Sequence, residues 1–527
     1  MKLAAKGLIL FLSLGAILTY AQSTYNTPLQ HVIVVIQENR TTDNIFGSNP
    51  TFEPGVNIVK VGDNYGGSIP LTPAEMTTCY DMLHRHRDFE AMWDNGLMDG
   101  ANGEGVFNPN PATCTVPKNN VPFVYIENGK KTTPPHLLDP YFQIAERYGF
   151  ANYMFQTNQG PTLPAHQFLL SGTSAPVAYP NQYYDWFAAE NPPGTKNAAR
   201  GCTGPMGQYD MEIEPTFPYN EAPGYTPPGA NAGFPCYDHD TLIDVLNSAT
   251  PPITWKYYVQ RLAGLVAAPT AMANICEPSQ PTGGTCTGVA YTGADPNVVG
   301  HSAQVLTDIQ NCVLPQVSWV TPDDTWSDHA GGTMGWGPSW VAAIVNAIGN
   351  STCADPAANW SNTAILITWD DWGGWYDHVA PPGMGYAGGN GNGIQYVYGF
   401  RVPLLVVSAY MTKAGYVSGS WNGTGSAPTT CPGPPYCHDF GSILNFIEYV
   451  FGSNQQSLGT IGPAEYPYAD SFVQDIVQPT YPYSLSDFFN FQQPPSTFTT
   501  IRAPYDASFF INYKGKAQDP DDDADEE

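Results

Sequence analysis

The feature that most constrains this chain is an apolar run that stops abruptly at two adjacent carboxylates. In the segment AILITWDDWGGWYDHVAPP, Asp370 and Asp371 follow directly after AILITW. A second apolar run, HVIVVIQ, is followed in the same way by Glu38 and Asn39. An unbroken run of Val, Ile and Leu is typical of a central parallel strand covered on both faces. Both runs therefore predict strands of one buried sheet, each ending in a pair of oxygen donors.

These two pairs predict a metal site. Ligands of open α/β sheets bind beyond the carboxyl ends of the strands, and three carboxylates converging there would repel one another unless a cation lay between them. For either pair alone, a turn or a helix cap is the simpler explanation, but the repetition favours a metal. Oxygen donors suit Mg²⁺, Ca²⁺ or Mn²⁺, and Zn²⁺ also accepts carboxylates, so the identity of the divalent cation stays open.

The segment NQGPTLPAHQFLLSG places Thr162 between a predicted strand and a predicted helix, at the N-cap position. A hydroxyl there can face a phosphate while the helix N–H groups point at the anion. It can also bind the metal and act as a nucleophile. On this motif alone, a plain N-cap threonine is the simpler interpretation.

Predicted strands and helices alternate along the whole chain, which indicates an α/β sandwich with a largely parallel central sheet. The 50 prolines and 52 glycines predict long loops around it. The predicted strands span residues 31–37, 150–155, 253–260, 316–322, 364–369 and 401–410. The predicted helices span residues 81–98, 138–148, 162–171, 241–249, 302–314, 339–350 and 441–452.

The first residues predict export. Residues 1–21 have the form of a signal peptide: Lys2 and Lys6, then the apolar LILFLSLGAIL, then small residues around Ala21. A membrane anchor would need about 20 apolar residues, and this run is shorter. We therefore expect a secreted or periplasmic protein without a transmembrane segment.

Ten cysteines without any C-x-x-C pair agree with an oxidising compartment and predict disulfide-bearing loops. Pairing of sequence neighbours, Cys276 with Cys286 and Cys431 with Cys437, is the simplest arrangement, although the sequence alone does not fix connectivity.

We expect a catalytic domain over residues 25–475 and a C-terminal extension over 476–527, which ends in the acidic, disordered tail QDPDDDADEE. The net charge of −28 argues against a nucleic-acid partner. A site for an anionic group must therefore carry local positive charge, which a metal ion would supply.

Six motifs occur in a familiar order: ENRTTDNIFG, GLMDG, GPTLPAHQFLLSG, VSWVTPDDTWSDH, AILITWDDWGGWYDHVAPP and HDFGSILNFIEYVFG. This series, from Gln30 to Phe451, resembles the bacterial phosphoesterase family that contains phospholipases C and acid phosphatases, relatives of the alkaline phosphatase superfamily. The resemblance implies an alkaline-phosphatase-like sandwich. It also implies hydrolysis of phosphate esters, with a phospholipid head group among the candidate substrates.

The resemblance further implies a metal held by Glu38, Asn39, Asp370 and Asp371, with Thr162 as nucleophile and additional ligand. The second aspartate is often glutamate in this family, and SDH stands where SEHP is common.

Three histidines match family histidines that surround the phosphoryl group: His84, His301 and His329. His86, two residues after His84, is a rival for the first of these positions, and the sequence does not decide between them.

The sequence thus predicts a secreted, metal-dependent, phospholipase C-like phosphodiesterase with a threonine nucleophile. An acid phosphatase acting on monoesters is the alternative on the same centre. A non-catalytic metal- or carbohydrate-binding secreted protein is the alternative from another class. We expect the aromatic segment 176–237 to wall the site, with Tyr183, Tyr184 and Trp186 as candidate head-group contacts. The oligomeric state stays open.

Overall fold

The computed structural model describes most of the chain. The described residues are 25–108, 111–129, 135–176, 187–194, 198–213, 233–331, 334–383, 397–431, 437–459, 461, 482–516 and 518. The predicted signal peptide, the acidic tail from 519 onward and the aromatic residues Tyr183, Tyr184 and Trp186 lie outside them. No helix among the described residues is long and apolar enough to cross a membrane.

An eight-stranded sheet forms the centre of the protein. Only β15 runs against its neighbours, so the expected largely parallel α/β sheet is confirmed. In spatial order the strands are β12 (Val298–Val299), β11 (Trp255–Tyr258), β13 (Val317–Val320), β1 (His31–Gln37), β14 (Thr363–Trp369), β15 (Leu404–Ser408), β8 (Gly149–Ala151) and β16 (Tyr416–Ser418).

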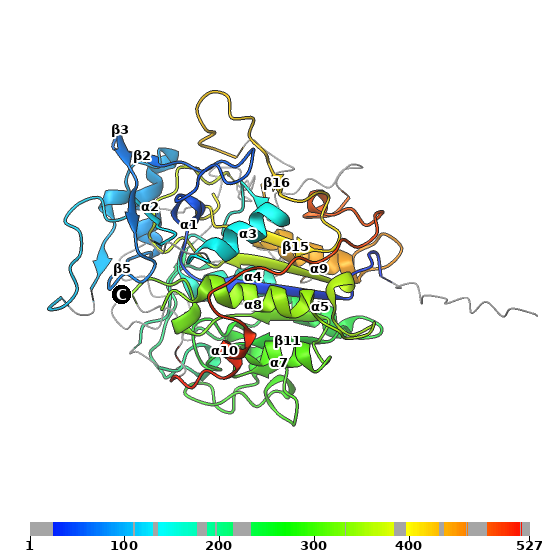
Figure 1. Cartoon of the computed structure of the whole chain (residues 1–527). Helices are drawn as coiled ribbons and strands as arrows, with labels where there is room; N and C mark the ends of the chain where they lie inside the picture. Colours follow the sequence, from blue (N-terminus) through cyan, green and yellow to red (C-terminus); the bar gives the residue numbers. More distant parts are fainter. Residues whose placement is uncertain are drawn as a thin grey trace, which may run out of the picture.

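Ten α-helices are described around this sheet (Figure 1). They are α1 (Thr42–Phe46), α2 (His86–Trp93), α3 (Asp139–Arg147), α4 (Thr162–Ser171), α5 (Leu242–Ser248), α6 (Ala273–Cys276), α7 (Gln304–Gln310), α8 (Gly337–Gly349), α9 (Phe440–Phe451) and α10 (Ala507–Ile511). Helices α3, α7 and α10 pack on α8, which lies against β14, whereas α5 and α9 pack on α4.

Four small two-stranded sheets lie outside the central one. They pair β2 (Val61–Asn64) with β3 (Gly67–Pro70), β4 (Thr72–Ala74) with β7 (Val124–Ile126), β5 (Asp81–Met82) with β6 (Val106–Phe107), and β9 (Phe187–Ala188) with β10 (Glu212–Ile213).

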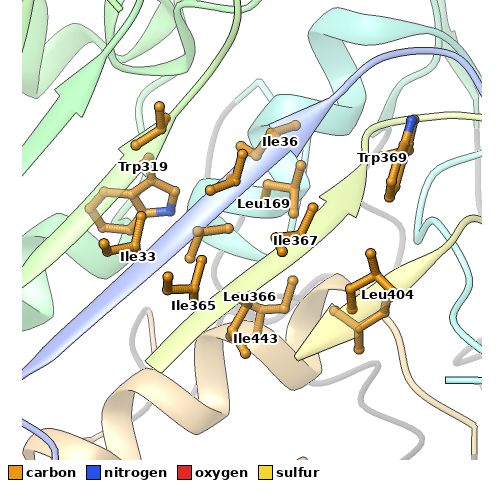
Figure 2. Packing of buried hydrophobic residues seen from close by; sticks show 14 of the residues in the cluster. Ile33, Ile36, Leu169, Trp319, Ile365, Leu366, Ile367, Trp369, Leu404 and Ile443 are labelled. Carbon is orange, nitrogen blue, oxygen red and sulfur yellow. The ribbon is translucent and has the colours of Figure 1, made fainter. Parts of the chain in front are cut away.

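The core is densest where β1 and β14 lie side by side. All residues of both strands are buried, and they pair in register with Ile33 opposite Ile365. Figure 2 shows their side chains packed with Leu169 of α4 and Ile443 of α9. Each fully buried aliphatic side chain of this kind contributes about 1.5–3 kcal/mol relative to an exposed one. The two strands that precede the predicted metal ligands are therefore held rigidly in the centre of the fold.

All ten cysteines are paired, and the two predicted neighbour pairs, Cys276–Cys286 and Cys431–Cys437, are confirmed. The other three disulfides join residues more than thirty positions apart: Cys79–Cys114, Cys202–Cys236 and Cys312–Cys353.

Three local predictions were wrong. The expected helix over 81–98 is interrupted, because residues 81–82 form β5 and the helix starts only after Arg85, whose backbone N–H donates to the Asp88 carboxylate. The expected strand 150–155 is limited to β8, after which Phe155 makes only an isolated bridge. Thr162 is the first residue of α4 rather than its N-cap, which is Pro161.

The described part of the C-terminal extension packs against the main body. Phe510 of α10 lies 5.5 Å from the Trp326 ring and 5.3 Å from the Trp340 ring, centroid to centroid. Further along, the backbone of Gln518 bonds with the Asp323 carboxylate and with the N–H of Asp324. Residues 482–516 and 518 therefore belong to the same packed unit as the sheet.

Candidate metal centre

The two oxygen-donor pairs meet because their strands are hydrogen-bonded neighbours. The ladder between β1 and β14 continues past the strand ends. The Asp370 N–H donates to the Gln37 carbonyl at 3.0 Å, and the Arg40 N–H donates to the Asp371 carbonyl at 3.0 Å. The chain segments that carry Glu38 and Asn39 therefore run directly beside Asp370 and Asp371, and all four side chains are fully buried.

The Asp370 carboxylate is oriented by the backbone around it. Its Oδ1 accepts hydrogen bonds from the N–H groups of Asn39 at 3.1 Å and Asp371 at 2.8 Å. Its Oδ2 is buried and makes no hydrogen bond with any described residue. One oxygen is thus fixed by the backbone and the other is directed into the centre.

His166, which the sequence analysis did not select, completes this group. Its Nε2 lies 3.7 Å from Glu38 Oε1 and 3.6 Å from Asp370 Oδ2. One donor atom from each of the three residues lies within 4.8 Å of the others. His166 follows Thr162 by four residues on α4, so the two share a helix face. This i, i+4 spacing in TLPAH was the signal that could have identified it.

Asn39 is oriented by His84. The His84 Nδ1 lies 2.9 Å from the Met82 carbonyl, which can only accept, so Nδ1 carries the proton. Nε2 of the neutral ring then accepts from Asn39 Nδ2 at 3.2 Å. With the amide nitrogen held in this way, Asn39 Oδ1 is the atom left to act as a ligand.

The geometry separates the two rival histidines. His84 Nε2 also lies 4.0 Å from Asp371 Oδ2, so this ring is part of the centre. The His86 ring instead contacts the Gln159 carbonyl at 3.0 Å and Glu90 Oε1 at 3.7 Å. His86 thus links α2 to the loop before α4.

His329 is brought to the same region by the loop after β13, the other neighbour of β1. Its ring centroid lies 6.4 Å from that of His84. Nδ1 lies 2.6 Å from the Ala330 carbonyl and 3.5 Å from Asp81 Oδ2. The carbonyl accepts a hydrogen bond from Nδ1–H, and the buried Asp81 carboxylate lies beside the same nitrogen.

His301 is the predicted site residue that the structure does not bring to this group. It is exposed and precedes α7. Its charge acts on Asp323. Burial raises the pKa of the Asp323 carboxyl, and the nearby His301 offsets part of this rise.

The two glycines of the motif allow the strand ends to approach each other. Gly373 has a φ of +59°, and a Cβ placed on it would lie 2.4 Å from the Asn39 carbonyl oxygen. Gly374 has a φ of +71°, and its Cβ would lie 2.4 Å from Met82 Cβ. Any larger residue at either position would displace the segments that carry Asn39 and His84.

Asp328 anchors the loop that carries His329. Its Oδ2 accepts from the Tyr141 hydroxyl at 2.7 Å and from Trp369 Nε1 at 3.0 Å, while its carbonyl accepts from Arg40 Nε at 2.7 Å. Burial raises the pKa of Asp328 to about 6, and burial lowers the pKa of Arg40 to about 10.

Asp377 and His378, further along the segment that carries Asp370 and Asp371, belong to a second buried group. Arg401 forms ion pairs with Asp43 and Asp377, both at 3.0 Å, and the His378 ring contacts Asp43 at 2.6 Å. These acidic groups also cluster closely enough for a cation. The Arg401 guanidinium already lies against both carboxylates as their counter-charge, and His378 contacts Asp43, so we interpret this group as a structural ion network.

The first group fits a divalent cation. Asn39 Oδ1, Asp370 Oδ2 and His166 Nε2 are buried and make no hydrogen bond with the described residues, which is costly unless a ligand compensates for it. Carboxylate, amide and imidazole donors are those that divalent metals take in proteins. Glu38, Asn39, Asp370 and Asp371 are therefore candidate ligands, with His166 beside them.

Comparison with known proteins identifies the family of this chain. The model of the Phosphoesterase family matches residues 29–454. A non-hemolytic phospholipase C of Burkholderia pseudomallei (strain K96243) is 25% identical over 526 residues, covering 90% of this chain and 60% of that protein. Phospholipase C A of Mycobacterium tuberculosis (strain ATCC 25618 / H37Rv) is 25% identical over 440 residues, covering 76% of this chain and 71% of that protein. The match to the family model covers most of the chain and includes every candidate ligand, and the chain therefore belongs to the Phosphoesterase family.

Proposed function

We propose that this protein is an exported, metal-dependent hydrolase of phosphoric esters, of the phospholipase C type, in which Thr162 is the nucleophile. The observation that carries the proposal is the convergence of Glu38 and Asn39 with Asp370 and Asp371 at the ends of two neighbouring parallel strands. The family match and the phospholipase C relatives give the reaction class.

The position of Thr162 supports its role. It is fully buried and begins α4, the end of the helix at which the helix dipole favours an anion. His166, one turn later on the same face, reaches Glu38 and Asp370. Because side chains of a helix lean toward its N-terminus, His166 inclines toward Thr162. The hydroxyl thus belongs to the side of the helix that faces the acidic group.

In the proposed reaction, Thr162 Oγ1 loses its proton to solvent water and forms a bond to phosphorus as the bond from phosphorus to the leaving oxygen breaks. His329, whose ring lies beside the Asp81 carboxylate, donates a proton to the leaving alkoxide. Water then hydrolyses the phosphothreonine and regenerates the hydroxyl. A bound divalent cation supplies positive charge that lowers the hydroxyl pKa and offsets the charge of the phosphoryl oxygens.

The finer features belong to the same proposal. The sheet and its helices form an alkaline-phosphatase-like sandwich, residues 1–21 direct export to the periplasm or the medium, and residues 25–475 form the catalytic domain. The five disulfides support an oxidising compartment. The substrate is a phosphate ester, with a phospholipid head group as the candidate diester and no nucleic acid as partner. His301 remains a predicted contact of the phosphoryl group without structural support.

The test compares turnover of two chromogenic esters, p-nitrophenyl phosphorylcholine and p-nitrophenyl phosphate, by the wild type, Thr162→Ala and Thr162→Ser. We expect Thr162→Ala to lose several orders of magnitude in kcat with its fold unchanged, and Thr162→Ser to keep part of the activity because the hydroxyl remains. Wild-type turnover by Thr162→Ala would mean that another group attacks phosphorus.

The two substrates also separate the alternatives. Preference for the choline diester supports the phospholipase C type, whereas preference for the monoester makes the protein an acid phosphatase with the same centre. No hydrolysis of either ester, with metal bound, would support the non-catalytic metal-binding alternative.

A further inference from the structure

We propose that His166 is a ligand of the metal and that its nitrogen makes the centre prefer a transition-metal ion, such as Zn²⁺, over Mg²⁺ or Ca²⁺. This inference rests on the proposed function, because it names the class of metal that the same centre takes. It adds a nitrogen donor to the oxygen ligands implied by the resemblance: Glu38, Asn39, Thr162, Asp370 and Asp371.

The hydrogen bonds behind His166 fix which of its nitrogens carries a proton. The Tyr257 hydroxyl donates to the Val266 carbonyl at 2.8 Å, and a carbonyl can only accept. The single hydroxyl proton is therefore committed, so the Tyr257 oxygen accepts from His166 Nδ1–H at 3.0 Å. Nε2 of the neutral ring then carries a lone pair. Metal-binding histidines typically have such a partner on the ring nitrogen that does not bind the metal.

This lone pair faces two carboxylates. Nε2 lies 3.7 Å from Glu38 Oε1 and 3.6 Å from Asp370 Oδ2, all three side chains are fully buried, and Nε2 makes no hydrogen bond with the described residues. A neutral lone pair between buried carboxylates is repulsive unless a cation lies between them. An ion about 2.0–2.2 Å from each donor requires donors no more than about 4.4 Å apart, and both distances satisfy this limit.

The nitrogen donor determines the class of metal. Mg²⁺ and Ca²⁺ are bound almost entirely by oxygen ligands, whereas imidazole suits Zn²⁺, Fe²⁺, Ni²⁺ and Cu²⁺. A centre with an imidazole and two or more carboxylates therefore binds Zn²⁺ or Fe²⁺ more tightly, relative to Mg²⁺ and Ca²⁺, than a centre lined only by oxygen atoms would. The competing arrangement is a doubly protonated His166 that forms ion pairs with Glu38 and Asp370 without binding a metal.

The experiment measures metal binding by the purified full-length protein after removal of metal with a chelator. Affinities for Zn²⁺ and Mg²⁺ are measured for the wild type, His166→Gln and Tyr257→Phe. His136→Gln is the matched control, because His136 lies three residues before α3 and its ring contacts Asp139. We expect His166→Gln to lower Zn²⁺ affinity at least about 100-fold and Tyr257→Phe about 10–100-fold, while Mg²⁺ affinity changes much less and His136→Gln matches the wild type.

Pulsed electron paramagnetic resonance of the Mn²⁺-loaded protein gives a direct second measurement. We expect nitrogen hyperfine coupling from a bound imidazole in the wild type and in His136→Gln, and its loss in His166→Gln. Absence of this coupling in the wild type, or equal Zn²⁺ affinity of the wild type and His166→Gln, would overturn the proposal in favour of the ion-paired histidine. If His166→Gln does not fold, the wild-type coupling and the Tyr257→Phe affinities decide the question.

These measurements do not depend on turnover, so the two proposals can fail separately. Nitrogen coupling without ester hydrolysis would refute the proposed function alone. Hydrolysis with a metal that shows no nitrogen coupling would refute the role of His166 alone.

Discussion

Replacement of Gly373 by alanine tests whether the close contact between the two strand ends positions the metal centre. The new Cβ would lie 2.4 Å from the Asn39 carbonyl oxygen and 2.6 Å from Asn39 Cβ. Ordinary van der Waals contact begins at 3.4 Å, so the two segments must separate by about 1 Å. Asn39 cannot yield alone, because its N–H is bonded to Asp370 Oδ1 and its φ is +58°. The displacement should therefore move both ligands.

The expected cost follows from this displacement. A misplacement of about 1 Å among catalytic groups lowers activity about 100-fold. Separately, alanine in the left-handed backbone region lowers the free energy of unfolding by roughly 1–2 kcal/mol. We expect kcat/KM for the preferred ester to fall about 100-fold in Gly373→Ala, together with metal affinity.

The matched control is Gly66→Ala. Gly66 also has a positive φ, +75°, but a Cβ there meets nothing within 4 Å. It should lose similar backbone stability and keep wild-type activity. Steady-state kinetics, metal titration and urea unfolding of both variants measure these effects. Wild-type kcat/KM in Gly373→Ala would refute the argument that this contact holds Asn39 in place.

Three further predictions concern buried charge and the metal. Burial raises the pKa of Asp328 to about 6 from an ordinary 3.8. Between pH 3.8 and pH 6, Asp328 is therefore protonated in the native state and ionised in the unfolded state. Wild-type stability should therefore fall by about 2.5 kcal/mol relative to Asp328→Asn as the pH rises from 4 to 7, and parallel urea-unfolding profiles of the two proteins would contradict this. Arg401→Met leaves Asp43 and Asp377 buried without their cation, so we expect a loss of about 3–5 kcal/mol in unfolding free energy at neutral pH, smaller in acid. A chelator should abolish ester hydrolysis and re-added metal should restore it; full activity after verified metal removal would contradict a metal-dependent reaction.

The sequence by itself determined the strand core and the acidic edge of the centre. The apolar runs of β1 and β14 favoured central strands of a doubly covered sheet, because short runs rich in Val and Ile are typical of such strands. Parallel neighbours end at the same edge, so the pairs that begin at Glu38 and Asp370 had to meet once the two strands became adjacent. The short disulfides, such as Cys276–Cys286, were also predictable, because ten residues of chain already keep the two thiols close.

Only the tertiary structure decided which further side chains join this edge. His84 and His86 are two residues apart, and the choice between them depends on which ring reaches Asn39 and which reaches Gln159. His301 precedes a helix as expected, yet it is exposed.

His166 shows the physical reason most clearly. Its spacing from Thr162 was visible in the sequence, but its chemistry depends on Glu38 and Asp370 from two distant strands and on the Tyr257 hydroxyl from a third. Local patterns of polarity determine where a strand or helix forms and which face is buried. The protonation and ligand role of a buried side chain depend on atoms that only the packing of remote segments brings within a few ångströms.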